Sequence, residues 1–127
     1  MLERGDRVPH FDVTTLDGGR ARYNEVWQRK NLLLVSISDA EASESSGYVA
    51  RLSAGRPALT AHDTALVVTT DHVDGVPRPG IVIADRWGEI HFVAHAPAAA
   101  GLPDPDELTG WLRYVQQQCP ECEGEAR

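Results

Sequence analysis

The chain has 127 residues, a formal net charge of −7 and 42% hydrophobic residues. The length favours one globular domain over residues 1–127, and no apolar stretch approaches the roughly 18 residues that cross a membrane. An acidic chain is a poor match for nucleic acid or an anionic membrane surface, so we expect neither as a partner. Residues 1–6 contain no apolar signal region, which predicts a cytoplasmic protein.

The first elements expected along the chain form a β-hairpin. Apolar and polar residues alternate over residues 11–15, which is the period of a strand. The Asp-Gly-Gly sequence at 17–19 is a turn signal and predicts pairing with residues 20–23. Asn24 is then a candidate N-cap for a short helical turn through residues 25–27.

Two buried strands with a helix between them are expected next. Residues 32–37 are nearly all apolar, which is typical of a central parallel strand, and residues 65–70 repeat this pattern. The helix between them buries Tyr48 and ends at Gly55. Residues 57–64 are ambiguous between a loop and a short helix.

A second hairpin is expected over residues 81–93. Residues 81–83 are a β-branched apolar run, and Pro79 stands just before it, where a missing N–H costs little. The Asp-Arg-Trp-Gly sequence at 85–88 supplies a turn in which Gly88 is free to take positive φ.

The last element expected is an amphipathic helix. Residues 94–105 are rich in Ala, Pro and Gly, which predicts a loop. The helix opens at Pro105 or Asp106 and is stopped by Pro120. Its apolar residues recur at helical spacing: Leu108, Trp111, Leu112 and Val115.

Two motifs resemble thioredoxin-fold redoxins of the peroxiredoxin (alkyl hydroperoxide reductase and thiol-specific antioxidant-like) family. The spacing of Pro79, Asp85 and Gly88 resembles their cis-proline hairpin. Their opening is matched by Gly5, Pro9, Phe11, Asp17 and Gly18. With the element order, this implies an α/β, thioredoxin-like fold: a central mixed sheet of four to five strands, helices on both faces and an N-terminal β-hairpin. It also implies a cis Arg78–Pro79 bond beside the loop of residues 38–46.

The resemblance also shows where the usual redoxin chemistry is missing. The reactive cysteine of redoxins sits where the first central strand meets its helix, but residues 39–46 contain none. On the peroxiredoxin spacing, Ser43 takes the position of the threonine, Ser46 that of the cysteine and Pro79 that of the arginine, with Arg78 one residue early. A serine hydroxyl is not appreciably ionised and forms no sulfenic acid, so we predict no conventional peroxidase activity. Helix capping is the favoured interpretation of the serines.

The two cysteines of the chain, Cys119 and Cys122, form a Cys-Pro-Glu-Cys sequence near its end. This spacing suits a redox-active dithiol or a disulfide. The redoxin fold implies that the last helix runs away from the usual active site, so its C-terminal dipole and the nearby glutamates would raise the thiol pKa. Zinc bound by such pairs from two chains, and inert thiols, are the alternatives.

Two classes of function stay open at this point. In the first, the chain is a thiol–disulfide oxidoreductase that acts on a protein or peptide through Cys119 and Cys122. In the second, it is a redox-dead module that binds a protein or peptide in the groove beside Pro79. No cofactor is expected, and a homodimer is possible. We expect the five histidines, which show no metal-ligand spacing, at surface or edge positions: His10, His62, His72, His91 and His95.

Overall fold

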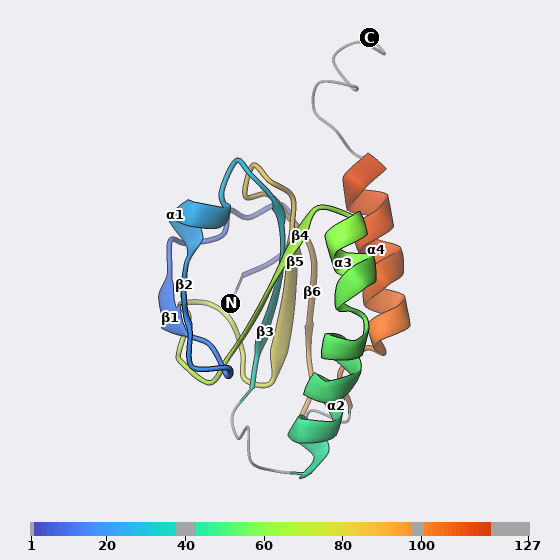
Figure 1. Ribbon diagram of the computed structural model, residues 1–127. Helices are drawn as coiled ribbons and strands as arrows, with labels where there is room; N and C mark the ends of the chain where they lie inside the picture. Colours follow the sequence, from blue (N-terminus) through green and yellow to red (C-terminus); the bar gives the residue numbers. More distant parts are fainter. Residues whose placement is uncertain (1, 38–42, 98–100, 118–127) are drawn as a thin grey trace, which may run out of the picture.

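The centre of the structure is a four-stranded mixed sheet with strand order β4-β3-β5-β6 (Figure 1). The computed structural model describes residues 2–37, 43–97 and 101–117, without the side chains of residues 43–46. The elements in chain order are β1 (Asp12–Thr14), β2 (Arg20–Arg22), α1 (Tyr23–Val26), β3 (Asn31–Ser36), α2 (Ser43–Ala54), α3 (Arg56–Ala61), β4 (Thr64–Thr69), β5 (Gly80–Ala84), β6 (Ile90–His95) and α4 (Pro105–Gln117). This order, with the β1-β2 hairpin apart from the sheet, confirms the predicted thioredoxin-like fold.

The strand register gives the sheet two ends that matter for function. β3 pairs in parallel with β4, whereas β5 runs antiparallel to both β3 and β6. Ser36, the last residue of β3, lies opposite Gly80, and we call this the Pro79 end of the sheet. Leu32, near the start of β3, lies opposite Ala84, just before the β5–β6 turn, and we call this the turn end.

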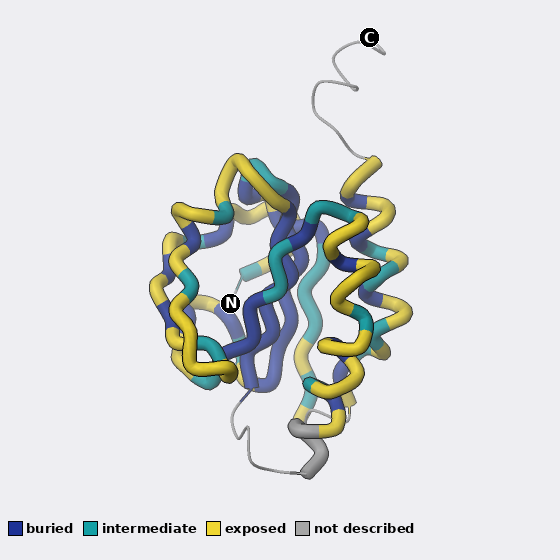
Figure 2. Tube along the Cα trace, viewed as in Figure 1, coloured by how far each residue is buried: buried dark blue, intermediate teal, exposed yellow. Residues whose placement is uncertain are grey.

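The helices are divided unequally between the two faces of the sheet. Helices α2, α3 and α4 cover one face, and α1 covers the other together with the β1-β2 hairpin (Figure 1). Because side chains alternate along a strand, Leu33 and Val35 pack on the side of Leu112, while Leu32 and Leu34 pack on the hairpin side. Figure 2 shows the result: buried central strands between partly exposed outer layers.

Helix α1 begins earlier than predicted, and Asn24 is not its N-cap. Arg22, the last residue of β2, holds the N-cap position with extended backbone (φ −114°, ψ 126°) and no side-chain cap bond. The N–H of Tyr23 donates to the carbonyl of Phe11 at 2.9 Å. The hairpin, and not a polar side chain, therefore fixes where this helix starts.

Two other boundaries are clarified by the structure. The ambiguous stretch at 57–64 begins as helix α3. Strand β6 continues to His95, because Gly80 of β5 pairs with it, so the loop predicted from residue 94 starts too early. Helix α4 begins at Pro105 as predicted, and its predicted stop at Pro120 lies outside the described residues.

The turn between β5 and β6 is held by one carboxylate and one glycine. Asp85 Oδ1 accepts the backbone N–H groups of Trp87 at 2.9 Å and Glu89 at 3.0 Å. Gly88 has φ 87°, as predicted, and a Cβ there would lie 3.1 Å from the Tyr23 hydroxyl oxygen. The predicted hairpin is therefore confirmed, and its turn needs both residue types.

Candidate functional site

The Arg78–Pro79 peptide bond is cis, as the resemblance to the redoxin hairpin predicts. Pro79 is buried and directly precedes Gly80, which pairs with Ser36. It therefore lies where the chain leaves β3, at the junction that carries the reactive cysteine in redoxins. The loop expected beside it falls largely outside the described residues.

Arg78 is exposed and already has a partner. Its Nη1 donates a 2.7 Å hydrogen bond to the carbonyl of Thr70, just past the end of β4. The neighbouring backbone is tightly packed, since a Cβ at Gly80 would lie 2.3 Å from the Pro77 carbonyl oxygen. The guanidinium is thus held on the loop between β4 and β5, and Pro79 offers no cation in its place.

Four predicted site residues have side chains outside the described part of the chain: Ser43, Ser46, Cys119 and Cys122. The backbone of the two serines forms the first turn of α2. The described chain ends at Gln117, two residues before the first cysteine. The structure therefore locates only the elements that adjoin these residues.

Helix α4 runs from the Pro79 end of the sheet to the turn end, as expected. Near its start, the Pro103 carbonyl accepts a 2.6 Å hydrogen bond from the hydroxyl of Tyr48 in α2. At its other end, Gln116 Oε1 accepts a 2.6 Å bond from Nδ2 of Asn31, the first residue of β3. The last turn of α4 contains no basic residue, so nothing in it offsets the partial negative charge of the helix C-terminus.

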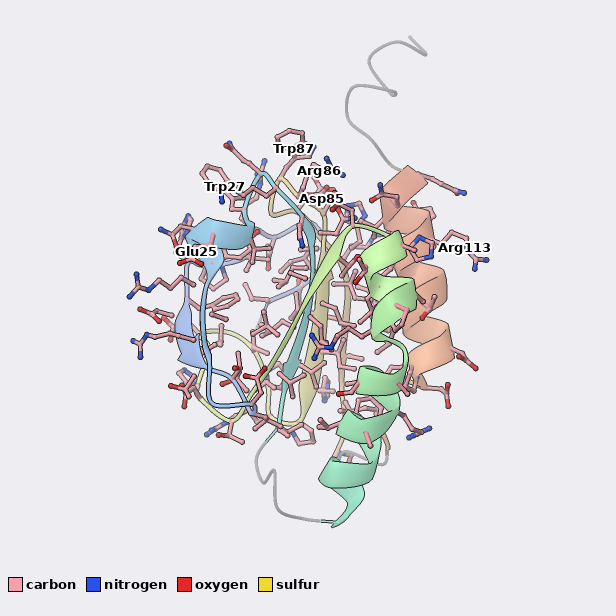
Figure 3. The ribbon with its side chains drawn as sticks, in the orientation of Figure 1. Glu25, Trp27, Asp85, Arg86, Trp87 and Arg113 are labelled. Carbon is pink, nitrogen blue, oxygen red and sulfur yellow. The ribbon has the colours of Figure 1, made fainter. Side chains whose placement is uncertain are left out.

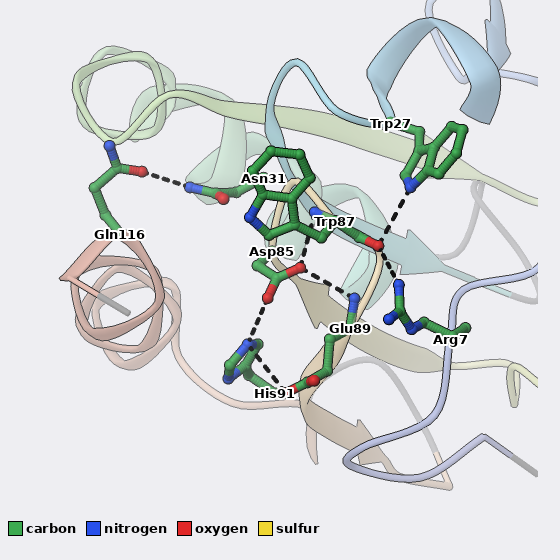
Figure 4. A network of polar contacts seen from close by, with 8 residues as sticks. All are labelled: Arg7, Trp27, Asn31, Asp85, Trp87, Glu89, His91 and Gln116. Carbon is green, nitrogen blue, oxygen red and sulfur yellow. Dashed lines mark hydrogen bonds and ion pairs between the residues drawn. The ribbon is translucent and has the colours of Figure 1, made fainter. Parts of the chain in front are cut away.

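At the turn end, three side chains converge that the sequence analysis did not bring together: Asp85, Glu89 and His91 (Figure 4). His91 Nε2 lies 3.0 Å from Asp85 Oδ2 and 3.9 Å from Glu89 Oε2. One potential ligand atom from each residue lies within 4.8 Å of the other two. Asp85 and His91 are buried, with 7% and 9% exposure, whereas Glu89 is exposed.

Of the five histidines expected at surface or edge positions, His91 lies in the edge strand β6 but is buried. The Asp85 carboxylate satisfies its Nε2, and the ring packs edge-on against Tyr114 of α4, with centroids 6.3 Å apart. A buried histidine is stable when its polar atom has such a partner. The sequence contains a signal for this contact. Asp85 and His91 stand on either side of a predicted tight turn, and such a turn places the two flanking strands side by side.

Asp85 is held in its ionised form. Burial, the largest influence, raises the pKa of its carboxyl, but the hydrogen bonds from His91 and from the backbone N–H groups of Glu89 and Trp87 outweigh it. The net pKa is lower than the ordinary value for aspartate. The carboxylate therefore supplies a fixed negative charge at this end of the molecule.

The turn that carries Asp85 is anchored to the N-terminal layer. The Trp87 carbonyl accepts hydrogen bonds from Arg7 Nη1 at 2.7 Å and from Trp27 Nε1 at 3.2 Å. Figure 3 shows Asp85, Arg86 and Trp87 at the same end of the molecule as Trp27, far from the start of α2. The cluster is thus built on a well-supported turn, at the opposite end of the sheet from Pro79.

The comparisons with solved structures identify the fold class. The reduced 2-Cys peroxiredoxin of Plasmodium vivax is 13% identical, with a TM-score of 0.73 over 90% of this chain and 96% of that chain. AhpC of Mycobacterium tuberculosis is 15% identical, with a TM-score of 0.71 over 95% and 98% of the two chains. A thiol peroxidase from Chromobacterium violaceum is 18% identical, with a TM-score of 0.64 over 94% and 90%.

These neighbours establish the thioredoxin-like fold found in peroxiredoxins and thiol peroxidases. No protein-family model matches the chain, and no curated protein matches it. Within residues 2–37, 43–97 and 101–117, no helix has the length and apolar character needed to span a bilayer.

Proposed function

We propose that this chain is a redoxin-fold thiol–disulfide oxidoreductase that acts through Cys119 and Cys122 and does not reduce peroxides at the β3–α2 junction. The observation that carries the proposal is the distribution of thiols on this fold. The sequence has two cysteines, and neither lies in β3, in α2 or between them. Both follow α4, whose last described turn is at the opposite end of the sheet from Pro79.

The proposed reaction transfers two electrons from the dithiol to a disulfide of a protein or peptide. The thiolate of one cysteine attacks one sulfur of the substrate disulfide, forms a mixed disulfide and releases the other substrate sulfur as a thiolate. The second cysteine then attacks the mixed disulfide and releases the substrate as a dithiol. The chain ends as the Cys119–Cys122 disulfide, which a second thiol donor must reduce.

The electrostatics at the end of α4 argue for slow exchange. A helix C-terminus and the flanking Glu121, Glu123 and Glu125 all disfavour a thiolate. We therefore expect attack to keep accelerating as the pH rises through and beyond the ordinary thiol value of about 8.5.

A redox-inactive binding module is the second candidate. The observation that favours it is the cysteine-free β3–α2 junction beside the buried cis Pro79. Such a junction could hold an extended segment of a protein or peptide without any thiol chemistry.

The test is the reduction of a disulfide-linked peptide by the full chain, with glutathione as the donor. The wild type is compared with Cys119→Ser/Cys122→Ser, with and without a zinc chelator. The proposal expects turnover that the double variant loses and the chelator leaves unchanged. Equal rates for wild type and double variant would contradict it and favour the binding module. Turnover that appears only with the chelator would show zinc held by the thiols, and would also contradict it.

A further inference from the structure

We propose that Asp85, Glu89 and His91 form a site for one divalent transition-metal ion, and we assign Zn²⁺ as the ion. The site lies on the β5–β6 hairpin at the turn end of the sheet. It needs neither cysteine, so it is separate from the thiol chemistry proposed above.

The spacing of the ligand atoms is close to that of a zinc site. Zinc binds histidine nitrogen and carboxylate oxygen at about 2.0–2.2 Å in tetrahedral geometry, which puts two ligand atoms roughly 3.3 Å apart. His91 Nε2 is 3.0 Å from Asp85 Oδ2 and 3.9 Å from Glu89 Oε2. Glu89 is the exposed residue of the three, so a small rotation of its side chain can bring its carboxylate oxygen closer to His91 Nε2, to the spacing of two zinc ligands.

Two of the three ligands are already oriented. Asp85 Oδ1 is occupied by the N–H groups of Trp87 and Glu89, which leaves Oδ2 directed at His91. The His91 ring is buried against Tyr114 and directs Nε2 at both carboxylates. Hydrogen bonds that fix a ligand in this way are the usual second layer of a metal site.

The charges around the cluster also favour a cation. Two carboxylates face one imidazole, and no lysine or arginine of the described residues lies within 4.0 Å of either carboxylate. Two nearby arginines are engaged elsewhere. Arg86, next to Asp85 in sequence, pairs with Asp63 at 3.1 Å, and Arg7, whose backbone forms a β-bridge with Glu89, donates to the Trp87 carbonyl. A divalent ion would balance both carboxylates.

The cluster can be reached from solvent. Glu89, one of the three ligands, is exposed, so an ion can approach the cluster from that side. Three protein ligands leave a fourth position for water or an external donor, which is the arrangement of an open zinc site. The imidazole favours zinc over magnesium and calcium, which prefer sets of oxygen ligands alone.

The test is calorimetric titration of the full chain carrying Cys119→Ser/Cys122→Ser with Zn²⁺, so that the thiols cannot contribute. We expect one zinc ion per chain. Adding His91→Gln should abolish binding, and adding Glu89→Gln should weaken it at least about tenfold, since even residues that only orient a ligand cost that much. His95→Gln, an exposed histidine of the same strand, is the matched control and should leave the affinity unchanged.

Absence of zinc binding by the thiol-free chain would overturn the proposal. So would unchanged affinity in Glu89→Gln, which alters an exposed residue and therefore tests the site even where His91→Gln impairs folding. Displacement of zinc by Mg²⁺ at equal concentration would overturn the assignment to a transition metal.

Discussion

Two buried tyrosines illustrate how differently the same side chain is held on the two faces of the sheet. The Tyr48 hydroxyl donates to the Pro103 carbonyl at 2.6 Å. The Tyr23 hydroxyl, on the hairpin side, has no hydrogen-bond partner among the described residues. A buried polar group without a partner costs stability, whereas a satisfied one contributes to it.

The first prediction compares phenylalanine at these two positions. Tyr48→Phe should lower the free energy of unfolding by about 1 kcal/mol, because a hydrogen bond is lost and a carbonyl is left without its donor. Tyr23→Phe should leave it unchanged or raise it, because only an unsatisfied hydroxyl is removed. Urea denaturation of the two variants and the wild type makes the comparison. An equal loss of stability in both variants would contradict the difference in hydrogen bonding between the two hydroxyls.

The second prediction concerns stability at alkaline pH. Burial, with the charge of Asp85 adding to it, raises the pKa of Tyr23 to about 12. A raised pKa means that the folded state holds the proton more tightly than the unfolded state does. Its contribution is therefore complete below the ordinary value of 10.0 and is lost as the pH rises toward about 12.

The free energy of unfolding should consequently fall above pH 10, and it should fall less steeply in Tyr23→Phe. Parallel denaturation curves across this range provide the measurement. Identical pH profiles for variant and wild type would show that Tyr23 does not titrate with folding.

At the scale of elements, the β5–β6 turn depends on the backbone freedom of Gly88. Its φ of 87° disfavours any other residue, and a Cβ would also approach the Tyr23 hydroxyl oxygen at 3.1 Å. Gly110 lies inside α4 with helical backbone, and a Cβ there would meet no atom within 4 Å apart from its chain neighbours and the backbone of its own helix. Alanine at these two glycine positions should therefore change the free energy of unfolding in opposite directions.

The third prediction is that Gly88→Ala lowers the free energy of unfolding by about 1 kcal/mol or more, since alanine cannot adopt this conformation without strain. Gly110→Ala should raise it by about 0.5–1 kcal/mol, because alanine favours a helix interior over glycine. Thermal or urea unfolding of both variants tests the pair. Stabilisation by Gly88→Ala would mean that the turn does not need positive φ.

Elements that form because of their own residues were predicted from local patterns in the sequence. The apolar runs at 32–37 and 65–70 predicted two buried strands, the first of them central, and the structure has β3 in the centre and β4 at the edge of the sheet. The resemblance of the Pro79, Asp85 and Gly88 spacing to the redoxin hairpin implied the cis bond at Pro79. The strands follow from neighbours in the chain, whereas the cis bond was reached through the resemblance.

The errors concern features that depend on distant contacts. Asn24 looked like a helix cap, but the bond from Tyr23 to Phe11 across the hairpin places the helix start earlier. His91 was expected at a surface or edge position, and it does lie in the edge strand β6, but Tyr114 of α4 and Asp85 of the turn bury it. Neither contact is visible until the hairpin, the sheet and α4 are assembled.

At the scale of the whole molecule, the fold does not by itself determine the chemistry. The chain shares its thioredoxin-like fold with peroxiredoxins at only 13–15% identity in two of the structures compared. A common fold is set by apolar patterning and does not by itself carry an activity. We therefore propose that the function rests on the residues at the β3–α2 junction and after α4.

The fourth prediction is that Ser46→Cys restores little peroxidase activity. A peroxidatic thiolate needs a nearby cation as well as a helix N-terminus. On the peroxiredoxin spacing, Pro79 falls at the position of the arginine, and the Arg78 guanidinium is bonded to the Thr70 carbonyl. Steady-state peroxide consumption with a thiol donor measures the recovery, and turnover far above that of the wild type would show that a thiol alone is sufficient.

The most direct test of the central claim is one peroxide-consumption assay on three full-length proteins: the wild type, Ser46→Cys and Cys119→Ser/Cys122→Ser. We expect no peroxide turnover by the wild type and none by the double serine variant, because no thiolate lies at the β3–α2 junction. Robust turnover by the wild type that the double variant loses would contradict it. The C-terminal cysteines would then be a peroxide-reducing site, and the binding-module alternative would be excluded.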